Sequence, residues 1–229
     1  MKKIRAITYP KSGQHLMFEV LLKYFSKNIE YNSSSRRLNG GQMLQAGKFV
    51  FCEKNIHCNQ TPCSEPATNF QVMHNCNKFW YDHPEVNYLF LYRNPIYCIL
   101  SLANHGVEDS YTAGWKEMDY LVQFSKKIKE WKEWAYKWVI GNTCKNVLNV
   151  LYEDIIKNPE KEFTKIIKYI EPDKEINIEH LKEVIKFMKI EPKHQLTNFK
   201  YYKEMEGFLK YLEKSVEPEL KILNIPRIF

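Results

Sequence analysis

The sequence predicts an α/β protein, a single domain with a central, mainly parallel β-sheet flanked by helices. Short apolar runs alternate with stretches whose apolar residues recur at helical spacing, a pattern typical of βαβ units. Residues 86–92 give the strongest strand signal, a continuous apolar run typical of a strand covered on both faces. The length of 229 residues favours one domain over two, so we expect the domain to span residues 1–229.

The expected elements follow in order along the chain. Expected strands are short apolar runs that end in a turn or loop signal: residues 4–9, 48–52, 70–73, 86–92 and 147–152. Expected helices carry apolar residues three or four positions apart: residues 16–25, 96–105, 118–140, 160–170, 178–188 and 201–213. Polar stretches rich in Ser, Gly or Pro are expected loops: residues 31–47 and 53–68. Trp131, Trp134 and Trp138 stand at helical spacing, which predicts core packing.

The composition is typical of a globular protein, and the net positive charge fits an anionic partner. Hydrophobic residues make up 44% of the chain and charged residues 27%, which is enough for a core. The net charge of +7 fits a nucleotide, an acidic glycan, nucleic acid or a membrane surface. Nucleic acid is the weaker expectation, because the basic excess is spread along the chain and no recognisable nucleic-acid-binding module is present. The sequence shows neither a signal peptide nor an apolar run of about 18 residues, which predicts a cytoplasmic protein without a transmembrane segment.

The cysteines give no metal signature. Four of the six lie between Cys52 and Cys76, but none form a C-x-x-C pair, the spacing that zinc sites usually show. Free thiols in a reducing compartment are the default expectation. No metal is therefore expected.

Two segments at the ends of expected strands carry groups that hold phosphate-like anions. Residues 10–13 read Pro-Lys-Ser-Gly between a strand and a helix, and residues 93–95 read Arg-Asn-Pro, with Ser101 eight positions after Arg93. Cations, hydroxyls and backbone N–H groups at a helix start bind such anions, and an arginine can grip a phosphate with its planar fork. Each segment alone is more often an ordinary strand-end turn. Together they predict a ligand with phosphates at both ends.

These segments resemble motifs of the sulfotransferases that use PAPS (3′-phosphoadenosine 5′-phosphosulfate) and release PAP. Residues 9–16 stand in the place of the family's phosphosulfate loop, roughly Y-P-K-S-G-T-T-W. Arg93 and Ser101 match its R-N-P segment and the serine eight residues after the arginine, and residues 152–155 match its Y-E-D-hydrophobic segment. Order and spacing agree over residues 4–170, whereas residues 171–229 lack a matching segment. The resemblance implies a P-loop-kinase-like, three-layer fold and an acceptor that is a small molecule or a glycan.

The resemblance also implies roles for individual residues. The residues that match the family's cofactor-binding positions are Lys11, Ser12, Gly13, Gln14, His15, Arg93, Ser101 and Tyr152. Lys11 is further assigned to the bridging oxygen of the leaving phosphate, where negative charge builds. His74 ends an expected strand 19 residues before Arg93 and is the expected general base, the alternative being an ordinary strand-end histidine. His15 and His105 are rival candidates for this proton transfer.

Departures from the family pattern keep other functions open. Gln14 and His15 replace two threonines, Leu16 replaces an adenine-stacking tryptophan, and Val72 stands where a lysine is usual. One alternative is a PAP- or PAPS-binding module without turnover. Another is a nucleotide kinase-like P-loop protein, which is disfavoured because Lys11 precedes the glycine instead of following it. The sequence leaves open whether the acceptor is a hydroxyl or an amine and whether the chain forms a homodimer.

Overall fold

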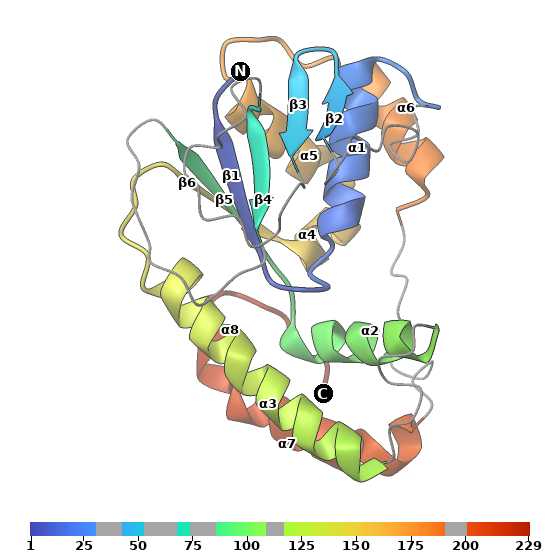
Figure 1. Cartoon of the computed structure of the whole chain (residues 1–229), viewed down its shortest axis with the longest axis vertical. Helices are drawn as coiled ribbons and strands as arrows, with labels where there is room; N and C mark the ends of the chain where they lie inside the picture. The colour runs from blue at the N-terminus through green and yellow to red at the C-terminus, as the bar shows by residue number, and fades with distance from the viewer. Residues whose placement is uncertain (31–42, 53–67, 74–85, 109–116, 191–200) are drawn as a thin grey trace. The chain divides into compact units, whose positions relative to one another are not determined.

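The computed structural model describes residues 1–30, 43–52, 68–73, 86–108, 117–190 and 201–229 (Figure 1). The chain divides into two compact units, and we describe each by itself. Unit 1 comprises Met1–Thr8, Gly13–Tyr92 and Thr143–Glu191. Unit 2 comprises Tyr9–Ser12, Arg93–Asn142 and Pro192–Phe229. The chain therefore passes between the units directly after strands β1 and β5.

Unit 1 contains a six-stranded sheet in the order β2-β3-β4-β1-β5-β6. Only β2 runs antiparallel to its neighbour, β3, and all other neighbours are parallel. The strands are β1 (Ile4–Thr8), β2 (Met43–Ala46), β3 (Phe49–Cys52), β4 (Phe70–Met73), β5 (Asn87–Tyr92) and β6 (Val147–Leu151). The predicted fold class, an α/β domain with a central, mainly parallel sheet flanked by helices, is confirmed.

The strand order identifies the end of the sheet where a ligand is expected. β1 and β5 are neighbours in the middle of the sheet. After β1 the chain forms β3 and β4 on one side of this pair, and after β5 it forms β6 on the other side. Such a switch in direction opens a crevice at the carboxyl ends of the two strands, where ligands of open α/β sheets bind. Thr8 of β1 is in register with Leu91 of β5. Residues 9–13 and 93–95, the two predicted anion-binding segments, follow these two strand ends.

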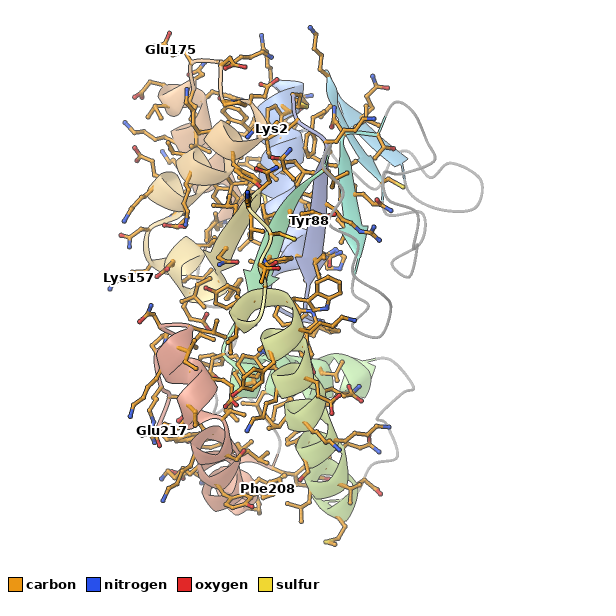
Figure 2. All side chains as sticks on the ribbon, turned by 90° about the vertical axis from the view of Figure 1, so that its left-hand side faces the viewer. Lys2, Tyr88, Lys157, Glu175, Phe208 and Glu217 are labelled. Carbon is orange, nitrogen blue, oxygen red and sulfur yellow. The ribbon has the colours of Figure 1, made fainter. Side chains whose placement is uncertain are left out.

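The core of unit 1 packs helices on the sheet. Alternate residues of β1 and β5, such as Ala6 and Leu89, share one buried cluster with α1, α5 and α6. Tyr88 and Phe90 on the opposite face of β5 are buried as well, so the prediction of a strand covered on both faces is confirmed (Tyr88 is labelled in Figure 2). The helices of this unit are α1 (Gln14–Ser26), α4 (Tyr152–Lys157), α5 (Pro159–Ile170) and α6 (Ile178–Met188).

Unit 2 is helical. Helices α2 and α3 contact each other, and both contact α7 (all three are labelled in Figure 1). Trp131, Trp134 and Trp138 are all buried, which confirms the predicted core role of the tryptophan stripe. The elements are α2 (Pro95–Glu108), α3 (Glu117–Ala135), the π-helical segment η2 (Tyr136–Ile140), α7 (Tyr202–Ser215) and α8 (Glu217–Ile222).

Two local predictions are wrong, and one short helix was not predicted. The loop predicted over residues 31–47 contains β2, a short edge strand. Its pairing with β3 defines it as a strand, and its own sequence shows no strand periodicity. Tyr152 begins α4 instead of ending the preceding strand. Helix α8 was not predicted, because its six residues are too few to show a helical period. The loop predicted over residues 53–68 lies outside the described residues except for Thr68.

The described residues show no sign of a membrane span or a metal site. No helix among them combines the length and apolarity needed to span a membrane. Cys52 and Cys98 are buried and Cys144 is partly exposed, and the remaining three cysteines lie in segments that are not described. The same residues contain no group of His, Cys, Asp or Glu side chains suited to a metal ion. The cytoplasmic location stays a prediction.

Candidate anion-binding site

Tyr9–Ser12 forms a tight turn in unit 2. The backbone N–H and the hydroxyl of Ser12 both donate to the carbonyl oxygen of Tyr9, at 3.1 and 2.6 Å. Lys11 between them adopts a φ of 65°, in the left-handed region that L-residues rarely occupy. Strain of this kind persists where the surroundings fix it, and it gathers at ligand-binding turns. Turns of this type direct backbone N–H groups into anion-binding concavities.

Tyr9 anchors this turn to α3. Its hydroxyl donates to the carbonyl oxygen of Lys127 at 3.0 Å. Its ring meets that of Trp134 edge to face, with centroids 5.9 Å apart. Both side chains are buried, so the tryptophan stripe supports the turn as well as the core of unit 2. This link to the site was not predicted from the sequence.

Arg93 brings the two predicted motifs together within unit 2. Its Nη1 donates to the carbonyl oxygen of Lys11 at 3.3 Å. Its guanidinium lies over the ring of Tyr97, 5.1 Å from the centroid, and the side chain is only 5% exposed. The cation from the second motif is therefore fixed directly beside the turn of the first.

Helix α2 begins at the same place. The Oδ1 of Asn94 accepts from the backbone N–H of Ile96 at 2.9 Å, which caps the helix start. Pro95 occupies the first helical position, where its fixed φ suits the helix and its missing N–H costs nothing. Ser101 lies farther along α2 and is buried. The Arg-Asn-Pro segment thus supplies a cation, a cap and a helix start in consecutive residues.

In unit 1, Gly13 is the N-cap residue of α1 and adopts a conformation that requires glycine. Its φ is 94°, and a Cβ atom on it would collide with the ring of Tyr152. No side chain caps the helix, and its first turn contains no acidic residue. The N–H groups of this turn and the helix dipole therefore favour an anion. Tyr152 itself is buried against this glycine.

Gln14 and His15, the two replacements for the family threonines, lie in different environments. Gln14 is buried, and its Oε1 accepts from the hydroxyl of Thr8 at 2.6 Å. His15 is exposed in the first turn of α1. Thr8 was not predicted as a site residue, although a polar residue at the end of an apolar strand is a usable signal. Thr8 fixes which way the Gln14 amide faces.

Acidic groups surround Tyr92 at the end of β5. Burial, as the largest cause, and the charges of Asp154, Glu153 and Glu162 together raise the pKa of its phenol to about 12. Tyr92 therefore stays protonated at neutral pH. Glu153 and Asp154 lie in the first turn of α4, where the helix dipole stabilises carboxylates. This structural role agrees with the sequence, from which no catalytic role was expected for either residue.

The expected general base, His74, lies next to a described strand end. His74 follows the last residue of β4, Met73, which is in register with Ile7 of β1, and lies outside the described residues. Its rival His105 is on α2, where its side chain is not described, and His15 is exposed. The assignment of His74 stays a prediction.

Comparisons with known proteins identify the fold. The structure of a retinol dehydratase in complex with androsterone and inactive cofactor PAP matches with a TM-score of 0.60 at 12% identity, covering 100% of this chain and 84% of that chain. The structure of the mouse sulfotransferase SULT7A1 complexed with PAP matches with a TM-score of 0.50 at 16% identity, covering 86% of this chain and 69% of that chain.

These likenesses establish a sulfotransferase fold, which is P-loop-kinase-like, and confirm the predicted architecture. At such identities they establish the fold alone. No protein-family model matches the chain, and no curated protein matches its sequence.

Proposed function

We propose that this protein is a PAPS-dependent sulfotransferase, which transfers a sulfuryl group to a hydroxyl or amine by in-line displacement. The observation that carries the proposal is the hydrogen bond from Arg93 to Lys11, because it joins the two anion-binding motifs within unit 2. The fold supports it further, since structures with the same fold contain PAP. The site residues remain part of the proposal.

The donor is bound at its two phosphate ends. Lys11 and the N–H groups of residues 13–15 at the start of α1 bind the 5′-phosphosulfate. Ser12 joins them when its hydroxyl turns from the carbonyl oxygen of Tyr9 to the anion. Arg93 and Ser101 bind the 3′-phosphate through the guanidinium fork and the hydroxyl. Tyr152 contacts the nucleotide. Gln14 offers its amide N–H groups to the anion, because its oxygen already accepts from Thr8.

The chemistry requires positioning and charge neutralisation. The acceptor oxygen or nitrogen attacks sulfur as the bond between sulfur and the bridging phosphate oxygen breaks, and PAP departs with the bonding electrons. Lys11 stabilises the charge that builds on the bridging oxygen. His74 takes the acceptor proton. Lysine and backbone donors supply the neutralisation, so the mechanism needs no metal.

The acceptor is proposed to be a small molecule with a hydroxyl or amine. The matched retinol dehydratase structures contain androsterone in one crystal and retinol in another, and both ligands are small. An acidic-glycan acceptor is the competing class, because the net charge of +7 would attract one. Comparing small alcohols, amines and glycans in one acceptor panel separates the classes.

The test is transfer of labelled sulfate from PAPS to this panel. We expect the wild-type protein to label at least one acceptor, and Lys11→Ala to lower the rate by about 100-fold or more, as the loss of one stabiliser of developing charge usually does. Lys126→Ala, which removes an exposed lysine of α3, is the matched control. A Lys11→Ala variant with unchanged turnover would contradict the proposed role.

Two other functions have distinct outcomes in the same experiments. A PAP-binding module without turnover is favoured by Gln14, whose amide oxygen is engaged by Thr8 where the resembled family has a threonine hydroxyl. PAP binding without transfer to any acceptor would support it. Magnesium-dependent ATP turnover would support a nucleotide kinase-like protein.

Sedimentation of the purified chain tests the homodimer, which stays a prediction.

A further inference from the structure

Glu213 of α7 is a fully buried carboxylate at the start of α2. Its side chain is 0% exposed. Its Oε1 accepts from the Nδ2 of Asn94 at 3.2 Å and from the backbone N–H of Ile228 at 2.7 Å. Its Oε2 accepts from the backbone N–H of Phe229 at 3.1 Å and lies 3.7 Å from the Nε of Arg227. All these groups belong to unit 2.

A carboxylate is costly to bury unless donors replace the water that it loses. Here the two carboxylate oxygens accept from donors in two separate segments, the start of α2 and residues 227–229. Arg227 is half-exposed and also pairs with Glu217 at the start of α8 (labelled in Figure 2), which holds the second segment in place. Glu213 therefore ties these two segments to α7.

Asn94 transmits this arrangement to the predicted phosphate site. Its Nδ2 donates to Glu213 and to the carbonyl oxygen of Pro226 at 3.0 Å, while its Oδ1 caps α2 through Ile96. The whole amide is thus engaged and its orientation is fixed. Arg93 immediately precedes Asn94, and Ser101 lies on the helix that Asn94 caps.

We infer that Glu213 is a positioning residue for the 3′-phosphate subsite, acting through Asn94 on Arg93 and Ser101. This inference rests on the proposed function. Glu213 does not touch the ligand, because a carboxylate would repel a phosphate. It orients Asn94 and residues 226–229 so that α2 begins where Arg93 is also held against the turn at Lys11. Its effect should therefore fall on recognition of the 3′-phosphate and not on the rest of the nucleotide.

The experiment compares two ligands that differ only in that phosphate. PAP and adenosine 5′-monophosphate (AMP) are titrated by calorimetry into the wild type, Glu213→Gln, Glu213→Ala and Asn94→Ala. A smaller fraction of binding-competent protein raises the apparent dissociation constants of both ligands by the same factor, so their ratio is unaffected. A positioning role changes that ratio.

We expect the wild type to prefer PAP, Glu213→Ala and Asn94→Ala to lower the preference about 10-fold, and Glu213→Gln to lower it less. The glutamine keeps one oxygen for Asn94 and Ile228 but turns an N–H group toward Phe229. Glu206→Gln is the matched control, since Glu206 lies on the same helix and its ion pair with Lys210 is largely exposed.

The outcomes separate the two hypotheses. A wild type that binds PAP in preference to AMP, with the same preference in Glu213→Gln and Asn94→Ala, overturns the role of Glu213 and leaves the proposed function standing. A wild type that binds neither ligand, or shows no preference between them, overturns both. If Glu213→Ala does not fold, Glu213→Gln and Asn94→Ala decide the matter.

Discussion

The turn at residues 9–13 is shaped by its neighbours in the sequence, whereas the segment at residues 93–95 is shaped by distant partners. Ser12 donates to a residue three positions away, and Gly13 provides the positive φ at the helix start. Asn94 instead binds Glu213 and Pro226, which are 119 and 132 positions away. A local motif can keep its geometry when the rest of the chain diverges. A motif built on distant partners depends on residues that no short pattern contains.

The largest effect is expected where the distant partners meet. Glu213→Ala leaves the Asn94 amide and the two backbone N–H groups of Ile228 and Phe229 without their buried acceptor. We expect a loss of about 4 kcal/mol in the free energy of unfolding, measured with urea. Glu206→Ala, which removes a surface pair on the same helix, should cost under about 1 kcal/mol. Equal effects of the two substitutions would contradict the distinction between the motifs.

The local motif should be sensitive at its glycine. Gly13→Ala places a Cβ against the Tyr152 ring at a φ of 94°, so strain and overpacking together should cost about 3 kcal/mol in unfolding free energy. Gly207→Ala is the control, because nothing lies within 4 Å of a Cβ at this position in α7. That substitution should stabilise the helix by about 0.5–1 kcal/mol. If Tyr152→Ala does not relieve part of the Gly13→Ala cost, the ring contact is not its source.

Alkaline pH should destabilise unit 1 through Tyr92. Its folded pKa of about 12 lies above the ordinary tyrosine value of 10.0, so the folded state favours the protonated phenol. Its contribution to stability is complete below pH 10 and is lost as the pH rises toward 12, by roughly 2–3 kcal/mol over that interval. Urea unfolding at pH 9 and pH 11.5 measures the loss, and Tyr92→Phe should remove part of it. A Tyr92→Phe variant with the same pH dependence as the wild type would exclude this cause.

The smallest effect is expected at the strand end beside the turn. Thr8→Val removes the hydroxyl that donates to the buried amide oxygen of Gln14, and the loss of this hydrogen bond should cost about 1–2 kcal/mol. The double variant Thr8→Val and Gln14→Met removes both partners and should recover most of the loss, as thermal unfolding can test. A double variant less stable than Thr8→Val would show that Gln14 has a separate structural role.

The sequence predicts what depends on local pattern. The apolar runs predict the parallel strands, and helical spacing predicts α6 at its observed bounds. The turn around Lys11 and Gly13 is predictable because glycine, strand end and helix start are adjacent. Strand β2 was missed because an edge strand is defined by its partner, and Tyr152 was misplaced because a helix of six residues has little periodicity.

Distant contacts explain what the sequence did not reveal at the site. Nothing in the Arg-Asn-Pro segment indicates that Asn94 needs a carboxylate from α7, and the acidic residue is one of 27 Asp and Glu residues in the chain. The edge-to-face contact of Tyr9 with Trp134 likewise joins residues that periodicity assigns only to a strand end and a helix core. Such pairs become visible when the fold is known.

Titration of PAP into the wild type and Arg93→Ala by calorimetry tests the central claim most directly. Arg93 is the side chain that joins the two anion-binding motifs. We expect PAP to bind the wild type at micromolar or lower concentrations, and Arg93→Ala to weaken this binding about 10- to 100-fold through the loss of a charge-assisted contact with the 3′-phosphate. No binding at micromolar concentrations, or equal affinity of the two proteins for PAP, would contradict it.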